Sequence, residues 1–233
     1  NWKAGTSFSN DASSTSVGSI DSAGSVNTDV GFSIITWTGN NTDNATIAHG
    51  LGVKPAMIIA KSRSVSGNWR VWHQDLSGAG YYLTLDDNSD EGNSTSVWGG
   101  SPVQTSTTFT IGTNSDVNTD SATYLAYCFA EVDGYSKFGQ YVGNDNADGP
   151  FVYTGFRPAF VMIKDITVAG QWIMYDNKRD PDNFAYHYLF ANTTSTEGTN
   201  INIGKIDFLS NGFKLRDNSN NSAAGQVDGA TPI

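Results

Sequence analysis

The stretch Gly52-Val-Lys-Pro-Ala-Met-Ile-Ile-Ala-Lys61 decides the fold, because it recurs further along the chain as Gly155-Phe-Arg-Pro-Ala-Phe-Val-Met-Ile-Lys164. In both strings a Gly and a Pro precede a short apolar run, which is the pattern of a buried β-strand. Pro55 and Pro158 are 103 positions apart, as are the two closing lysines. A string of this length that recurs at one spacing predicts two copies of one domain.

Three further pairs recur at nearly the same spacing. These are Phe32-Ser-Ile-Ile-Thr-Trp-Thr-Gly-Asn40 with Ser136-Lys-Phe-Gly-Gln-Tyr-Val-Gly-Asn144, Trp69 with Trp172, and Phe109 with Phe213. A nearly constant offset over several predicted strands is the mark of a tandem repeat. We therefore expect one repeat at residues 31–134 and a second at residues 135–233.

The ends of the two copies differ. The first copy closes with the apolar strand Tyr124–Glu131, whereas the second reaches Ala230-Thr231 and then Pro232-Ile233, so its last strand is expected to be missing. The missing strand would leave an open sheet edge, filled by following residues or by a strand from a neighbouring subunit. Residues 1–30 are expected to hold the stub of a preceding repeat and then an irregular polar linker.

The local patterns are those of an all-β protein. Period-two alternation in Ile35-Thr36-Trp37-Thr38 runs into the turn Gly39-Asn40, and no helical spacing persists over three turns. We expect strands at about residues 31–38, 55–61, 68–74, 81–85, 107–112 and 123–131, and again from residue 137. The predicted fold class is all-β, with tandem antiparallel β-sandwich domains of jelly-roll or lectin-like type.

Charge and hydropathy exclude two classes of partner. The 233 residues include 13 Lys and Arg against 23 Asp and Glu, which gives a formal net charge of −10. A phosphate backbone is held by clustered Lys and Arg, so we expect no nucleic-acid partner. The longest apolar runs, residues 56–60 and 159–163, are far shorter than the roughly 20 residues of a membrane-spanning helix, so no membrane insertion is expected. The single Cys128 allows no intrachain disulfide.

One acidic turn offers oxygen donors at alternate positions. Asp86, Asn88 and Asp90 have the spacing that a loop-wrapped calcium ion (Ca2+) prefers, although the chain lacks the bidentate Glu that completes an EF-hand loop. Asn and Asp also occupy turns because they tolerate positive φ and bond their own backbone. Calcium at this turn and a plain solvated turn both stay open, and no other cofactor is expected.

Aromatic residues are the candidates for contact with a sugar, because the C–H face of a sugar ring stacks on Trp or Tyr. Strand alternation in Trp69-Arg-Val-Trp-His73 places Trp69, Val71 and His73 on one face, which we expect to be core. Trp72 lies on the other face and is predicted to point outward. Its counterpart in the second repeat is Tyr175.

Trp98 and His73 complete the candidate binding set, His73 because an imidazole can hydrogen-bond sugar hydroxyl groups. Trp98 stands beside Gly99-Gly100 without a counterpart in the second repeat, and we expect it to be exposed. The sugar-binding candidates are therefore Trp72, Trp98, His73 and Tyr175.

No catalytic constellation is predicted. The chain has three histidines, no Gly-x-Ser-x-Gly elbow, no His-Glu-x-x-His motif and no paired cysteines. We therefore expect a protein that is not an enzyme. A pair of carboxylates for glycoside cleavage stays open, because 23 acidic residues allow many pairs.

The sequence resembles a known family in three places, and these strings are Gly31–Asn40, His49–Lys61 and Tyr124–Gly139. They are similar to a tandem domain of unknown function in large structural proteins of tailed phages, particularly marine and cyanobacterial ones, of the tail-fibre type. The similarity covers about residues 28–217 and the stub at residues 1–5. It implies no catalytic residues.

The resemblance implies a virion structural protein, extracellular in the particle. It implies a tail-fibre or spike segment that acts as a rigid adhesin for host recognition, with a host cell-surface glycan or protein as partner. A homo-oligomer is expected, as a trimeric fibre or a filament. Two alternatives stay open: a polysaccharide depolymerase, and a pure scaffold or filament subunit assembled by strand addition.

Overall fold

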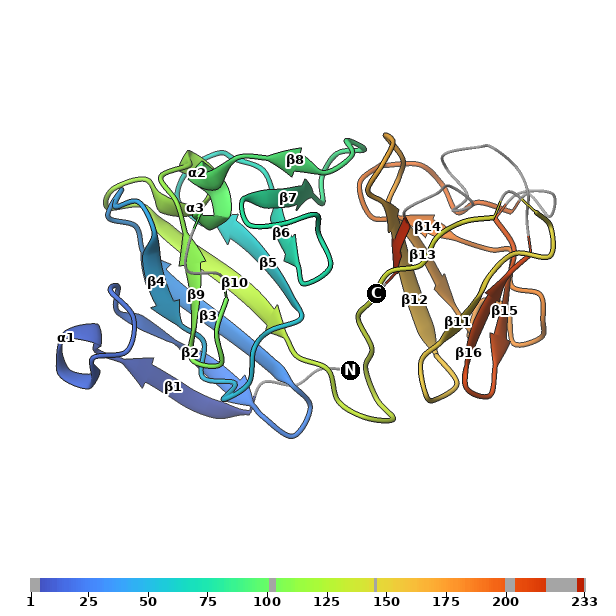
Figure 1. The fold of residues 1–233 in the computed structure, drawn as a ribbon, viewed down its shortest axis with the longest axis horizontal. Coiled ribbons are helices and arrows are strands. Elements are labelled where there is room, and N and C mark those ends of the chain that lie inside the picture. The colour runs from blue at the N-terminus through green and yellow to red at the C-terminus, as the bar shows by residue number, and fades with distance from the viewer. Residues whose placement is uncertain (1–4, 101–103, 145, 200–203, 217–229, 233) are drawn as a thin grey trace. The chain divides into compact units, whose positions relative to one another are not determined.

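The computed structural model describes residues 5–100, 104–144, 146–199, 204–216 and 230–232 (Figure 1). This part of the chain is built mostly of β-strands, and its helices α1 (Ala12–Thr15), α2 (Thr95–Trp98) and α3 (Ser115–Asn118) have four residues each. All pairs between the named strands are antiparallel. The predicted all-β fold class is confirmed.

The chain divides into two compact units. Unit 1 consists of Asn1–Thr84 and Gly92–Val132, and unit 2 consists of Leu85–Glu91 and Asp133–Ile233. Each unit has its own cluster of buried apolar side chains.

Unit 1 contains an eight-stranded sheet in the order β1-β2-β3-β10-β5-β6-β7-β8 and a two-stranded sheet of β4 and β9. The strands are β1 (Thr6–Asn10), β2 (Ser22–Asn27), β3 (Phe32–Thr38), β4 (Ala45–Ala48), β5 (Met57–Ser62), β6 (Arg70–His73), β7 (Tyr81–Thr84), β8 (Gly92–Asn93), β9 (Thr108–Ile111) and β10 (Thr123–Phe129). Ile47 of β4 and Phe109 of β9 share one buried cluster with Trp37 of β3 and Tyr124 of β10. Side chains from both sheets therefore form a single core.

Strand β10 lies at the centre of this unit and pairs with β3 on one side and with β5 on the other. Tyr124, Ala126 and Cys128 alternate into the core and are fully buried. Burial raises the pKa of the Cys128 thiol to about 12, because a thiolate would lose its hydration there. The thiol is therefore inert at neutral pH.

Each of the six strand regions expected in the first repeat contains an observed strand, but two other expectations are wrong. Residues 136–144, expected to start the strands of the second repeat, form no strand. Their buried aromatic residues, Phe138 and Tyr141, are three positions apart, whereas a strand buries every second residue.

The second error concerns the polar segment before β3, which was expected to be an irregular linker. It contains β1 and β2, which extend the large sheet beyond β3. Backbone pairing needs few apolar side chains, and small residues allow close approach. A Cβ atom on Gly24 would lie 1.8 Å from the carbonyl oxygen of Ile34. The stub of a preceding repeat, expected at the start of the chain, falls on residues 1–4 and lies outside the described residues.

Unit 2 contains two sheets, in the orders β11-β16-β15 and β14-β13-β12-β17. The strands are β11 (Phe151–Tyr153), β12 (Phe160–Asp165), β13 (Ile173–Asp176), β14 (Leu189–Phe190), β15 (Ile206–Leu209), β16 (Gly212–Leu215) and β17 (Ala230–Pro232). Phe208 and Phe213 from the first sheet share a buried cluster with Val161 and Tyr175 from the second.

Strand β17 occupies part of the edge that was expected to be open. It pairs with Ile163–Asp165 of β12, whereas β10 pairs with β5 along Met57–Ser62. Part of the edge of β12 that was expected to be open is therefore paired.

Candidate functional site

The structure overturns the exposure expected of Trp72, Trp98 and Tyr175. These three side chains are buried, as is His73, which was expected on the core face; all four have at most 5% of their surface exposed. Trp72 and Trp98 lie in the unit 1 core, and Tyr175 lies in the unit 2 core. Alternation along β6 gave the wrong result because both faces of this strand are covered: Val71 and His73 are buried as well. None of these side chains presents a face to a ligand.

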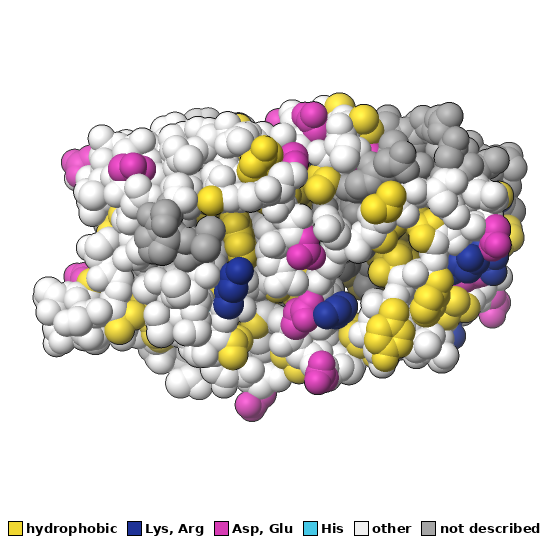
Figure 2. Space-filling model, in the orientation of Figure 1, with side chains coloured by type: hydrophobic (Ala, Val, Ile, Leu, Met, Phe, Trp, Pro, Cys, Tyr) yellow, Lys and Arg dark blue, Asp and Glu magenta, His cyan; other side chains and the backbone are white. Residues whose placement is uncertain are grey.

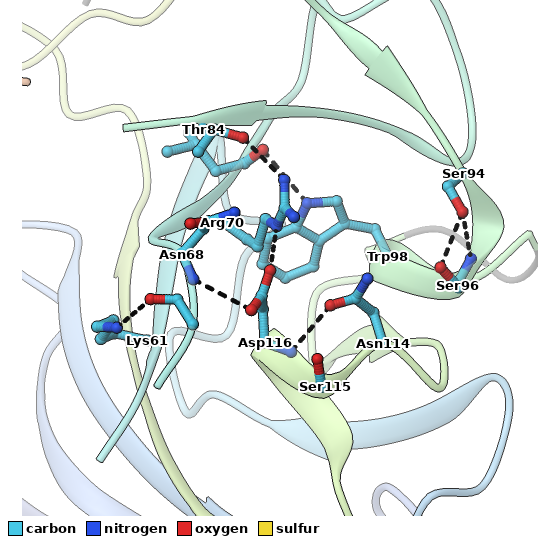
Figure 3. Close-up of polar contacts among 12 residues, drawn as sticks. Lys61, Asn68, Arg70, Thr84, Ser94, Ser96, Trp98, Asn114, Ser115 and Asp116 are labelled. Atoms are coloured by element: carbon cyan, nitrogen blue, oxygen red, sulfur yellow. Dashed lines mark hydrogen bonds and ion pairs between the residues drawn. The ribbon is translucent and has the colours of Figure 1, made fainter. Parts of the chain in front are cut away.

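Trp98 is held in the core by its position on α2 (Figure 3). Ser94 caps this helix by accepting a hydrogen bond from the amide of Ser96. The indole Nε1 of Trp98 donates to the carbonyl oxygen of Val71 on β6, 3.2 Å away. The one polar atom of the side chain is therefore satisfied inside the protein, as expected of a structural Trp.

A polar network beside Trp98 crosses the same core (Figure 3). Arg70 Nε on β6 donates to Asp116 Oδ2 on α3 at 2.7 Å, and Arg70 Nη1 donates to Thr84 Oγ1 on β7 at 2.8 Å. The other carboxylate oxygen, Asp116 Oδ1, accepts from the amide of Asn68 at 3.1 Å. Only 12% of the Arg70 side chain and 8% of the Asp116 side chain are exposed. This network ties β6, α3 and β7 together.

The two buried histidines of unit 1 are also structural. Burial lowers the pKa of His49 to about 4 and that of His73 to about 4, because the imidazolium form would lose its hydration. The Nδ1 atom of His49 accepts from the amide of Leu51 at 3.2 Å. At pH 7 both imidazole rings are therefore uncharged, and both are buried in the protein.

The predicted calcium turn is solvent-exposed at Asp86, Asn88 and Asp90. The carbonyl oxygen of Asn88 accepts a hydrogen bond from the amide of Gly170 at 2.8 Å. Within the ranges that the structure describes, no group of three or more His, Cys, Asp or Glu side chains is placed to hold a metal ion.

A different surface combines exposed aromatic rings with fixed charges, and it lies on the sheet β11-β16-β15. One face of this sheet forms the unit 2 core with Ile206, Phe208, Phe213 and Leu215. The residues between them point to the opposite side, which we call the outer face. In Figure 2, hydrophobic, basic and acidic side chains lie together on the surface over these strands.

The first aromatic pair of the outer face comes from the edge strand β11. Phe151 and Tyr153 are 44% and 66% exposed, whereas Val152 between them packs against the core. Tyr153 lies opposite Gly212 of β16. The Phe151 ring leans over the same glycine, since a Cβ atom there would lie 2.9 Å from Phe151 Cε2.

The second aromatic pair lies at the other side of the sheet, next to β15. Ala185 forms an antiparallel bridge with Ile206 and is fully buried, so Phe184 and Tyr186 flank it on the outer face. Their rings meet edge to face with centroids 6.3 Å apart. Phe184 is 40% exposed, and Lys205 Nζ lies 5.1 Å from its centroid.

Charged groups occupy the middle of the outer face. Arg216 Nε donates to Asp207 Oδ2 at 2.6 Å, and Lys214 Nζ lies 3.0 Å from Asp148 Oδ1. The hydrogen bond from Lys214 lowers the pKa of Asp148. The two ion pairs lie beside the aromatic rings on this face.

The comparisons with known proteins give a family. Residues 1–228 match the family described as Domain of unknown function (DUF7483). The chain belongs to the DUF7483 family. No curated protein and no solved structure matches it. The resemblance seen in the sequence was also to a domain of unknown function, and the family match agrees with it on that point. In the described residues of this DUF7483 chain, no helix is long and apolar enough to cross a membrane.

Next to the outer face, the DUF7483 chain orients a histidine. Asp180 is buried, and its carboxylate accepts from the amides of Tyr186 and His187 and pairs with His187 Nδ1 at 2.6 Å. The His187 ring stacks against Tyr186 with centroids 4.2 Å apart. Asp180 therefore fixes the loop that carries the second aromatic pair.

The sequence contains a local pattern that indicates this face. Phe151-Val152-Tyr153 and Phe184-Ala185-Tyr186 both show the aromatic–small–aromatic alternation of a strand with one apolar face turned outward. Aromatic residues that recur at the repeat spacing, such as Trp72 and Tyr175, lie in the cores, whereas these two pairs do not follow that spacing.

Proposed function

We propose that this DUF7483 chain is a segment of a tail fibre or spike of a tailed phage, built from two copies of one β-sandwich domain. In this role it is a rigid adhesin module in the virion, and its partner is a glycan on the host surface.

One observation carries the proposal. The rings of Trp37 and Phe109 in unit 1 meet edge to face at 5.5 Å between centroids, and those of Tyr141 and Phe213 in unit 2 meet edge to face at 6.4 Å. Both residues of the second pair stand 104 positions after those of the first. A contact between distant segments that recurs at the repeat spacing is expected of two copies of one domain.

The strand pairing supports the same interpretation. The neighbours β5, β6 and β7 in unit 1 correspond in order to β12, β13 and β14 in unit 2. Ile47 of β4 lies opposite Phe109 of β9, and Val152 of β11 lies opposite Phe213 of β16. In both units two sheets contribute to one core, as in a sandwich. Tandem sandwich domains suit a stiff, extended protein.

The adhesive part of the proposal is supported by the exposed aromatic side chains of unit 2. The depolymerase alternative requires a carboxylic acid whose pKa is raised. The pKa values of Asp11, Asp148 and Asp176 are instead lowered by hydrogen bonds to their carboxylates. None of these three groups has the character of a general acid.

Two measurements test the proposal. Mass spectrometry of purified particles of a phage that encodes the chain should detect its peptides, and their absence would overturn the assignment to the virion. The purified chain should bind immobilised bacterial polysaccharide without releasing reducing sugar, with the heat-denatured chain as control. Release of reducing sugar would replace the adhesin by the depolymerase.

A further inference from the structure

We infer that the outer face of the sheet β11-β16-β15 in unit 2 is a binding site for an extended polysaccharide chain. The inference rests on the proposed adhesive function and names the surface that performs it. The residues that carry it are Phe151 and Tyr153 at one side, Phe184 and Tyr186 at the other, and the charged groups between them.

The strand register places these groups in one row across the sheet. Phe151 lies opposite Lys214, and Lys214 lies opposite Asp207. The antiparallel bridge between Ala185 and Ile206 then places Phe184 beside Asp207. At about 4.8 Å between neighbouring strands, the two phenylalanine positions are roughly 14 Å apart. A ligand that contacts both sides must therefore be an elongated molecule that crosses the strands.

The chemistry of the row matches that of a sugar chain. An aromatic face carries negative partial charge, which attracts the C–H groups of a sugar ring. Sugar hydroxyl groups need hydrogen-bond donors and acceptors, and the pairs Lys214–Asp148 and Arg216–Asp207 supply both.

The same row is a poor match to a protein interface. The centres of such interfaces are depleted of Lys and Asp, whereas here charged residues occupy the middle and the aromatic residues stand at the sides. Among the described residues the face carries the basic groups of Lys205, Lys214 and Arg216 together with the carboxylates of Asp148 and Asp207. This mixture of donors and acceptors suits polar polysaccharides.

Phe151 and Tyr153 have no aromatic counterparts in unit 1. The positions in β4 that correspond to Phe151 and Tyr153 are Thr46 and Ala48, from the pairing with β9. In unit 1 the preceding segment lies along the edge of β4: the amide of Ser19 donates to the carbonyl oxygen of Thr46 at 2.8 Å, Ser22 Oγ donates to that of Ala48 at 3.0 Å, and Ile20 forms a bridge with Ile47. The strand with this edge segment carries small residues at the two positions, whereas β11 carries aromatic ones.

The test compares the whole 233-residue chain with single variants on an array of immobilised bacterial lipopolysaccharides and capsular polysaccharides. The polysaccharide with the strongest signal is then titrated in solution. Tyr153→Ala and Phe184→Ala should each weaken binding about tenfold or more, which corresponds to about 1.4 kcal/mol. Tyr153→Phe keeps the aromatic ring and should bind within about threefold of the unmodified chain.

Phe160→Ala is the matched control. Phe160 is 43% exposed, as Phe151 is 44% exposed, but it lies on β12 in the other sheet. This variant should bind like the unmodified chain, and circular dichroism should show the same folded state for all variants. Equal losses for Phe160→Ala and Tyr153→Ala would overturn the inference.

Other outcomes also count against the site. If the unmodified chain binds a polysaccharide and Tyr153→Ala and Phe184→Ala bind equally well, the outer face is not the site, although the adhesin stands. If Tyr153→Ala changes only the oligomeric state measured by light scattering, the face is a protein interface. If the unmodified chain binds no polysaccharide, the inference falls, while detection in virions still decides the structural assignment.

Discussion

Arg70 Nε donates to Asp116 Oδ2 at 2.7 Å across 46 positions of sequence, and this contact joins β6 to α3 inside unit 1. The Arg70 guanidinium also lies over the Tyr82 ring, 4.7 Å from its centroid. A buried ion pair is costly to break, because removal of one partner leaves a charge without compensation in a poorly hydrated place. The pair therefore makes the position of α3 dependent on β6.

Asp116→Ala should lower the free energy of unfolding of the chain by about 3–5 kcal/mol, since Arg70 would remain buried without its partner. Urea unfolding followed by tryptophan fluorescence measures the change. The control is Asp120→Ala, at an exposed position two residues beyond the helix, which should alter stability by less than about 0.5 kcal/mol. Equal effects of the two substitutions would mean that the ion pair contributes nothing specific.

Trp98→Ala should also destabilise unit 1, by about 3–5 kcal/mol, because it empties a core position that is only 2% exposed. The hydrogen bond to Val71 is lost as well. Chemical unfolding again gives the measurement, and Val142→Ala, at a side chain that is 68% exposed, is the control. An unchanged unfolding midpoint for Trp98→Ala would contradict the core position and indicate that the side chain is exposed, as the sequence suggested.

Gly24→Ala should detach β2 from β3, because the added Cβ would stand 1.8 Å from the carbonyl oxygen of Ile34. The expected cost is about 1–3 kcal/mol, as for other overpacked sites. Hydrogen exchange should show lost protection confined to β1 and β2. Gly139→Ala, where nothing lies within 4 Å of the added atom, should leave exchange unchanged. Normal protection of β2 in Gly24→Ala would contradict the close approach.

Stability should fall as the pH is lowered from 6.5 towards 4. His49 and His73 have a pKa of about 4 in the folded chain, against 6.5 for an unperturbed side chain, so the unfolded chain binds more protons in this range. Each histidine should reduce the free energy of unfolding by about 2.5 kcal/mol between pH 7 and 4.5. Above pH 7 neither contributes a pH dependence.

Urea unfolding at several pH values checks this effect. His49→Gln should remove about half of the slope between pH 6 and 4.5, and His73→Gln should remove the other half. Asp and Glu side chains titrate mainly below this window. A slope that both substitutions leave intact would show that the two rings are not buried in their neutral form.

The positions of most strands in unit 1 followed from the sequence, because period-two alternation is a local property of the chain. The segment with β1 and β2 escaped prediction for the opposite reason. Its stability comes from backbone pairing with β3 and from the small size of Gly24, and neither leaves an apolar pattern. Residues 136–144 resemble the sequence of β3, but they form no strand, because their buried aromatic residues Phe138 and Tyr141 are three positions apart.

For the candidate site, too, the sequence predicted local features, and the tertiary structure decided which side chains are exposed. The sequence by itself determined the all-β class, most strand positions in unit 1 and the spacing of 103 or 104 residues between similar strings, since these are properties of neighbouring residues and of their order. Only the tertiary structure decided that Trp72 and Trp98 are core and that Phe151 and Phe184 are exposed. Alternation separates the two faces of a strand, but which face is covered depends on elements distant in sequence that pack against it.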